Sequence, residues 1–120
     1  MKTAEEIKDL MYSFTGTTAY HEFSPLKSYP VITDGVFAVV EAAECLWFLE
    51  IIGHYQGENK KLDPDFQVWK LTKNADGSAV IQGFNDVTLI VTHEIDVTVF
   101  PLDELEVWLE NGVILLPSEH

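Results

Sequence analysis

The sequence contains no arginine, and its 20 acidic residues face only seven lysines. The formal net charge is therefore −13 at pH 7. Arginine supplies the paired hydrogen bonds that proteins favour for phosphate groups and guanine edges, and a strongly negative surface repels a nucleic-acid backbone. This composition predicts that the protein does not bind DNA or RNA directly.

Cysteine is almost absent as well, because Cys45 is the only one in the 120 residues. A single thiol cannot form an internal disulfide, and it is too few for a structural zinc site built on cysteines. Cys45 lies within an apolar run, so we expect it to be a small buried residue.

The sequence also lacks a long uninterrupted hydrophobic run. The longest apolar stretch, residues 36–52, is broken by Glu41, Glu44 and Glu50, and each of these would be costly in the centre of a bilayer. The first ten residues carry acids where a signal peptide has a basic start and an apolar run. We therefore expect no membrane span and a cytoplasmic location.

What is present is ordinary for a globular protein. Hydrophobic residues make up 47% of the chain and charged residues 22%, which predicts one folded domain over residues 1–120. The charge is unevenly distributed. Residues 1–73 hold all seven lysines and eleven acids, whereas residues 74–120 hold nine acids and no base. The acidic field therefore belongs mainly to the second part of the chain.

Two helices are predicted. The first spans about residues 3–14, because Thr3 and Glu6 form a capping-box pattern ahead of a stripe of apolar residues. The second begins at Thr33 or Asp34, runs to about residue 55 and is apolar around most of its circumference. We expect this long helix to lie across a sheet as the central core element, and the stretch between the helices to be a packed loop with one short strand.

Strands are predicted in the second half. Residues 66–73 and 78–84 read as two strands joined by a hairpin turn at residues 74–77. The β-rich stretch 87–100 supplies one long bent strand or two short ones. At the end, Asn111 and Gly112 suit the turn of a closing hairpin, with a helix over residues 103–110 as the alternative.

These elements predict an α+β fold. Two helices, one of them long and apolar, pack on a mostly antiparallel sheet of four to six strands. The predicted order is two helices followed by four or five strands, which segregates the helices from the sheet along the chain.

Three segments together resemble a known family. They are TDG from Thr33, FQVWKL from Phe66 and ENGVILLPSEH at the end of the chain. With them the sequence resembles, from about Thr15 onwards, the small bacterial and phage-associated proteins grouped as domain of unknown function 6876. These motifs form turns and packing contacts, so the resemblance implies a related fold, often encoded on mobile elements, and no activity or catalytic residue.

No motif indicates a cofactor, a metal or a catalytic site. The best metal candidates are His93, Glu94 and Asp96, with His21 and Glu22 elsewhere in the chain. On an extended strand His93 and Glu94 point to opposite faces, so this spacing does not predict a metal site.

A cysteine nucleophile is not indicated either. Cys45 and His54 lie nine residues apart in the predicted long helix. This spacing puts them about 13 Å apart along the axis and on opposite faces. We predict that the protein is not an enzyme.

The remaining signal is a set of acids mixed with aromatic residues, in which no lysine neutralises the charge. The predicted partner-binding residues are Glu94, Asp96, Asp103, Glu104, Glu106, Trp108 and Glu110. Such an array can bind a basic protein, and it can imitate the phosphates of a nucleic acid and block a defence or DNA-binding enzyme. The plainer interpretation is that the acids only keep an apolar domain soluble and monomeric.

Two further functions stay open. One is a self-associating structural protein, a homodimer in which Trp69, Trp108 and the closing hairpin pair two sheets across a two-fold axis. The other is a small metal-dependent enzyme with a pocket formed by His93, Glu94 and Asp96.

Overall fold

The structure is a computed structural model that describes residues 3–14, 20–22, 30–59, 61–96 and 100–119. In these residues the helices are α1 (Ala4–Ser13), α2 (Asp34–Ala43) and α3 (Leu46–Glu58), with a short 3-10 turn at Pro117–Glu119. None of these helices is long and apolar enough to cross a membrane. The α+β class predicted from the sequence is confirmed.

The strands of the described chain form one mixed sheet in the order β1-β2-β7-β6-β3-β4-β5. Only β2 and β7 run parallel, and the other neighbours are antiparallel. The strands are β1 (Tyr20–Glu22), β2 (Val31–Thr33), β3 (Phe66–Lys73), β4 (Ala79–Asn85), β5 (Thr88–Ile95), β6 (Glu104–Glu110) and β7 (Val113–Leu115).

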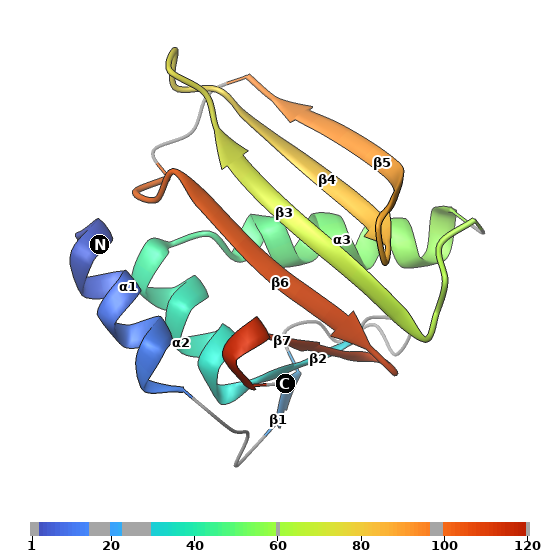
Figure 1. Ribbon diagram of the computed structural model, residues 1–120, viewed down its shortest axis with the longest axis horizontal. Coiled ribbons are helices and arrows are strands. Elements are labelled where there is room, and N and C mark those ends of the chain that lie inside the picture. The colour runs from blue at the N-terminus through green and yellow to red at the C-terminus, as the bar shows by residue number, and fades with distance from the viewer. Residues whose placement is uncertain (1–2, 15–19, 23–29, 60, 97–99, 120) are drawn as a thin grey trace.

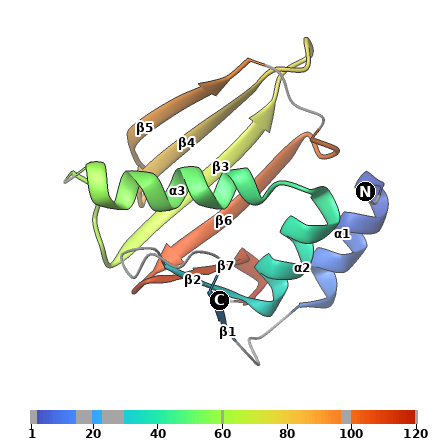
Figure 2. The ribbon, with the colours of Figure 1, turned by 180° about the vertical axis from the view of Figure 1, so that it is seen from behind.

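The helices cover one face of this sheet. Helix α3 crosses behind β3, β4 and β6, and α2 starts at the end of β2 and lies to one side of β2 and β7 (Figures 1 and 2). Helix α1 packs against α2 at one end of the molecule. No helix of the described residues lies on the opposite face of β6, β3, β4 and β5, which is called the open face below.

Helix α1 begins as the sequence predicts. Thr3 is its N-cap: the Thr3 hydroxyl accepts a hydrogen bond from the Glu6 amide, and the Thr3 amide donates to the Glu6 carboxylate at 3.1 Å. The capping box satisfies two main-chain donors that a helix start leaves without partners. Ile7 then buries its side chain completely and fixes α1 to the core.

The predicted long helix is wrong, because it is two helices. Glu44 adopts a left-handed conformation with φ of 54°, and the Cys45 amide donates to the carbonyl of Val40, which closes the end of α2. Helix α3 restarts at Leu46 in a new direction. Neither helix is apolar all round, since Glu41 and Glu50 are exposed. The break allows each helix to cover its own part of the sheet.

The strand count is also higher than predicted. The sheet has seven strands within the described residues rather than four to six, because β1 and β2 add to the strands predicted in the second half. These two strands lie between α1 and α2 in the chain, so the predicted order of two helices followed by all the strands is wrong. The closing hairpin is confirmed, with β6 and β7 joined at Asn111 and Gly112, both at positive φ. The alternative helix over residues 103–110 is therefore wrong. In the stretch 87–100, β5 ends at Ile95, and residues 97–99 lie outside the described part.

One buried polar network lies between α3 and the sheet. Gln67 is fully buried on β3, and its amide exchanges two 2.8 Å hydrogen bonds with the Gln56 side chain of α3. The side-chain oxygen of Gln67 also accepts a hydrogen bond from the Trp69 indole at 2.9 Å, and its side-chain NH2 group donates to the main-chain carbonyl of Asp63. Every polar atom of Gln67 is thus satisfied, which removes the penalty for burying it.

Candidate functional site

The open face places four of the predicted partner-binding residues side by side on β6. Alternation along the strand turns Leu105, Val107 and Leu109 into the core, where each is almost completely buried. The intervening residues point the other way, onto the open face: Glu104, Glu106, Trp108 and Glu110.

Glu94 lies on the same face at the far side of the sheet. Glu94 pairs with Val80 of β4, Val80 pairs with Thr72 of β3, and Thr72 pairs with Glu104 of β6. Glu94 and Glu104 therefore end one row that crosses four strands. Since neighbouring strands lie about 4.8 Å apart, the two residues are separated by about 14 Å. The row carries a carboxylate at each margin and no charge between them.

An apolar strip crosses the open face two rows away from Glu94 and Glu104. The next-but-one row contains Leu89, Phe84, Val68 and Trp108, and the Phe66 ring meets the Trp108 ring edge-on with centroids 5.6 Å apart. Apart from the exposed Leu89, these side chains are half-buried although no helix covers them. Aromatic groups held in this way at a surface are suited to anchor a partner.

Of the lysines that the structure describes, Lys70 lies among these groups. The Lys70 ammonium is 3.8 Å from the Glu106 carboxylate and 5.6 Å from the centre of the Phe84 ring. The Trp108 indole donates a 2.7 Å hydrogen bond to the other oxygen of Glu106. Glu106 is therefore held in place, whereas the carboxylates of Glu94 and Glu104 are exposed and have no such partner in the described structure.

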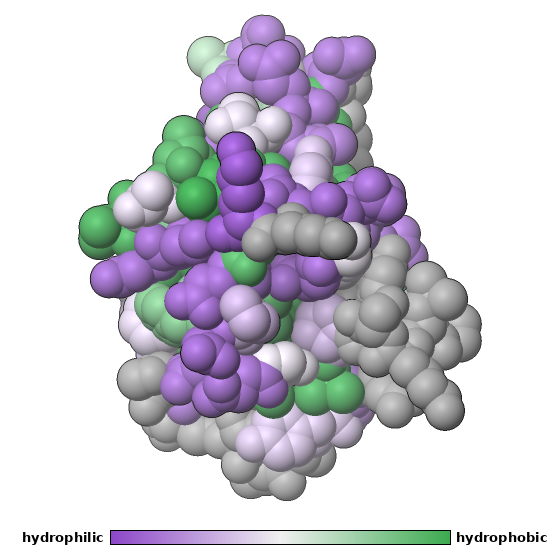
Figure 3. Space-filling view, turned by 90° about the vertical axis from the view of Figure 1, so that its right-hand side faces the viewer, coloured by the Kyte–Doolittle hydropathy of each residue, from purple (hydrophilic) through white to green (hydrophobic). Residues whose placement is uncertain are grey.

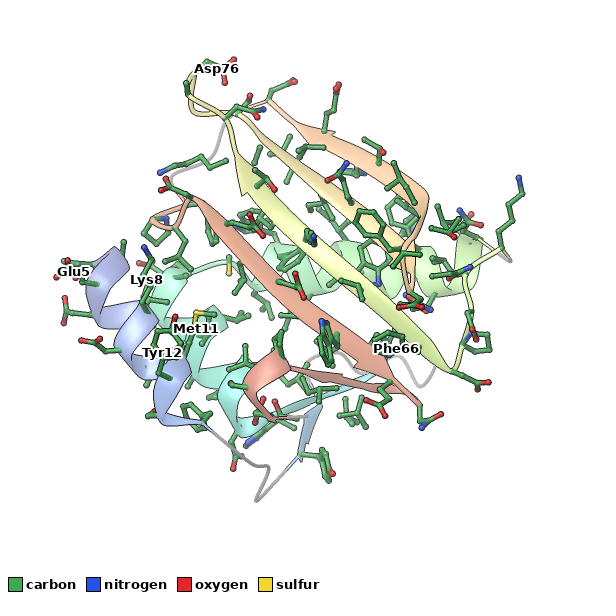
Figure 4. All side chains as sticks on the ribbon, viewed as in Figure 1. Glu5, Lys8, Met11, Tyr12, Phe66 and Asp76 are labelled. Carbon is green, nitrogen blue, oxygen red and sulfur yellow. The ribbon has the colours of Figure 1, made fainter. Side chains whose placement is uncertain are left out.

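A groove adjoins the acidic margin of the open face. It has a volume of about 410 Å³ and runs between Glu104 and Glu106 of β6 and helix α1. Lys8, Met11 and Tyr12 line it from the side of α1 (Figure 4). The open face thus continues into a hollow with one basic and several apolar groups.

The other predicted residues lie at one end of the sheet. Asp103 directly precedes β6 and is exposed, and its carbonyl accepts a hydrogen bond from the Lys73 amide at 2.8 Å. Asp96 is exposed and directly follows β5. They extend the negative margin beyond Glu94 and Glu104 but do not face the apolar strip.

Sequence reasoning missed Phe66, Val68, Lys70 and Phe84. Alternation along residues 66–73 and 79–85 could have placed each of them on the face opposite Trp69 and Ile81. The missing knowledge was the pairing of β3 with β6, because these strands are separated by about thirty residues and a long connection.

The candidate metal ligands do not come together. His93 points to the helix side, where its Nδ1 is 2.9 Å from the Tyr55 hydroxyl, while Glu94 lies on the open face. The His21 Nε2 is 2.8 Å from Asp34, and the His21 ring stacks on Phe37. Within the described residues, no three His, Cys, Asp or Glu side chains are placed to hold a metal ion.

Two other predictions are decided by burial. Cys45 is completely buried, as predicted, and burial raises the pKa of its thiol to about 12. It lies in the break between helices, while His54 is exposed on α3. The suggested pairing of two sheets through Trp69 is wrong, because the Trp69 side chain is fully buried under α3 and cannot reach a second molecule.

Comparison with known proteins places the chain in a family. A model for a family of unknown function (DUF6876) matches residues 5–120, which includes α1 and so begins earlier than the resemblance in the sequence indicates. No curated protein and no solved structure matches the chain.

Proposed function

The chain is a member of this family of unknown function (DUF6876), and we propose that it is a non-enzymatic interaction module that binds a basic protein through the open face. One observation carries the proposal. Glu94 and Glu104 end a row across four strands, and a strip of aromatic and aliphatic side chains crosses the same face two rows away, with Glu106 and Glu110 on either side of its Trp108 end. An apolar centre with a charged rim is the usual anatomy of a protein interface.

The two parts of the face have different roles. Phe66, Phe84 and Trp108 supply most of the affinity, since large aromatic groups that become desolvated dominate binding energies. The carboxylates speed association with a positively charged partner and exclude acidic ones. No lysine follows Lys73 in the sequence, and Lys70 beside Glu106 offsets only part of this negative charge.

We further propose that the partner is an enzyme that binds nucleic acid, such as a nuclease of a defence system. Glu104 and Glu106 follow each other at two-residue spacing on one face, which corresponds to about 6.8 Å along an extended strand. A regular row of negative groups on a rigid strand can occupy a groove built for backbone phosphates. In this case the protein competes with nucleic acid for the groove.

The test is capture of partners from a lysate of the source cells by three forms of the protein. The first is the wild type, and the second carries Glu94→Gln, Glu104→Gln and Glu106→Gln. The control carries Glu41→Gln, Glu50→Gln and Glu58→Gln, which removes the same charge from exposed positions on the helices. We expect a basic protein to bind the wild type and the control, to be lost from the open-face variant, and to be released by salt.

Other outcomes contradict the proposal. Equal loss from both variants means that only the total charge matters, and the open face is then not the interface. Capture that does not change with salt or with the open-face substitutions excludes an electrostatic interface. Trp108→Ala separates the two roles, because it should weaken the complex mainly by faster dissociation, with a change of about 2 kcal/mol or more.

A further inference from the structure

Strand β5 is an outer strand of the sheet. It pairs with β4 on one side, and in the described chain no strand lies on its other side. An outer strand presents a row of main-chain donors and acceptors that can pair with another chain.

The register shows which groups of β5 point outward. The Asn74 amide donates to the Ser78 carbonyl, and main-chain hydrogen bonds in an antiparallel pair recur at every second residue. Val80 and Gln82 of β4 therefore direct their main-chain groups towards β3. The alternate residues of β4 direct theirs towards β5, where their partners are Val91, His93 and Ile95. The amides and carbonyls of Thr92 and Glu94 therefore face away from the sheet.

The composition of β5 offers little protection against such pairing. Its sequence TLIVTHEI contains no lysine, proline or glycine and only one acid, whereas exposed outer strands usually carry charges or proline that block further pairing. Val87, in the turn that leads into β5, is 84% exposed, and Leu89 in β5 itself is 47% exposed. Figure 3 shows the side of the molecule where this turn lies, with apolar groups between polar ones.

We propose that β5 pairs antiparallel with β5 of a second copy, about a two-fold axis at Thr92. Thr92 then meets Thr92 of the copy, and Glu94 lies opposite Ile90 rather than opposite another acid. In this register, residues that point to the open face of one copy lie opposite residues that point to the open face of the other. The open faces of the two copies therefore form one continuous surface. Ile90 is the extra residue of a bulge in the pairing with β4, at Gly83/Phe84, so the regular edge ends there.

A second copy fits this edge better than the basic protein proposed for the open face. Only Glu94 among the eight residues of β5 is negative, so charge does not favour a basic partner here. The acidic margin on β6 lies three strands away and stays accessible in the dimer. The two interactions also respond oppositely to salt: the copies each carry −13, so salt should strengthen their association, whereas it should weaken binding of a basic protein.

The first measurement is amide hydrogen exchange of the wild type at low and high protein concentration, beside sedimentation velocity. We expect the amides of Thr92 and Glu94 to exchange fast when dilute and slowly when concentrated. The amides of Val91 and His93 pair with β4 and should be protected at both concentrations. A protein that stays monomeric at the highest concentration reached, or an exchange pattern without this alternation, overturns the proposal.

The second measurement compares variants of the residue at the proposed axis. Thr92→Pro removes an amide that β4 does not use, and Thr92→Lys places two like charges face to face. Both should raise the dimer dissociation constant at least tenfold, while Thr92→Ala, which keeps the amide, should leave it nearly unchanged. Circular dichroism shows whether each variant folds, and Thr92→Lys keeps the test valid if Thr92→Pro does not. Dimers that persist in both variants contradict this register, whatever the outcome of the partner capture.

Discussion

The hydroxyl of Thr33 donates a 2.6 Å hydrogen bond to the carboxylate of Glu119, across 86 positions of sequence. Thr33 is also the N-cap of α2, since the same hydroxyl accepts from the Val36 amide. The same oxygen of Glu119 accepts from the Leu116 amide at 2.9 Å. A buried carboxylate is thus placed at the positive end of a helix, where it is stabilised. The TDG segment and the C-terminal segment, recognised separately in the sequence, form one contact.

Gly35 should not tolerate a side chain. A Cβ atom at this position would lie 2.8 Å from the Glu119 carboxylate, so Gly35→Ala should lower the free energy of unfolding by about 1–3 kcal/mol. Gly57→Ala is the matched control, because nothing lies within 4 Å of its Cβ position in α3, and this change should stabilise by about 0.4–1 kcal/mol. Urea denaturation of both variants measures the difference.

A double substitution tests whether Glu119 causes that penalty. Glu119→Ala alone should destabilise the protein by about 1–3 kcal/mol, because Thr33 and the Leu116 amide lose a buried acceptor. Added to Gly35→Ala, it should cost less than the sum of the two single changes, since the clash is then gone. Additive effects would show that the two residues are not in contact.

Stability should fall at alkaline pH because of Cys45. Burial raises the pKa of its thiol from 9.0 to about 12. Between these values the folded protein keeps the proton while the unfolded chain releases it. Stability is therefore complete below pH 9.0 and decreases above it, with a slope approaching about 1.4 kcal/mol per pH unit. Urea denaturation of the wild type and Cys45→Ala across this range should show the extra slope only in the wild type.

The buried Gln67 network should be sensitive to loss of its polar atoms. Gln67→Leu leaves the Trp69 indole and the Gln56 side chain without their partners, so we expect a loss of about 1–3 kcal/mol. Gln82→Leu is the control, since Gln82 lies half-exposed on the open face and the change there should stay within about 0.5 kcal/mol. Thermal unfolding of both variants compares them, and equal effects would contradict the network's role.

Gly83 and Trp69 should respond as a pair. A Cβ atom on Gly83 would lie 2.7 Å from the Trp69 ring, which is fully buried against that strand. Gly83→Ala should destabilise by about 1–3 kcal/mol, and Trp69→Phe should recover part of that loss in the double variant because the smaller ring leaves space. Calorimetry of the three variants measures the coupling, and no recovery would place the strain elsewhere.

Local patterns predicted the local elements. The capping box at Thr3, the hairpin turn at residues 74–77 and the closing turn at Asn111 all form where the sequence indicates. The break at Glu44 could not be predicted, because a non-glycine residue at positive φ is uncommon and no proline or glycine marks it. Tertiary packing of α2 and α3 on different parts of the sheet decides that break.

The candidate site was predicted only in part, because local patterns identify its residues on one strand but not the residues that face them from the next strand. Period-two alternation places Glu104, Glu106, Trp108 and Glu110 on one face without any knowledge of the fold. The facing residues Phe66 and Lys70 depend on the register between β3 and β6. Likewise β1 and β2 are three residues long, too short for an alternation pattern to give their bounds, whereas β7 is equally short but is indicated by the closing turn at Asn111 and Gly112.

The central position of β6 sets an order for folding. Strands β3, β4 and β5 are joined by short turns and can pair as soon as they collapse, whereas β2 joins the larger part of the sheet by pairing with β7, near the end of the chain. Pairing β2 with β7 closes a long loop of chain, and this step is slow because the chain loses conformational entropy before the contacts that compensate for it form. The part formed by β1, β2 and α2 should therefore dock last, after the β6–β7 hairpin has joined the meander and created the edge that receives it.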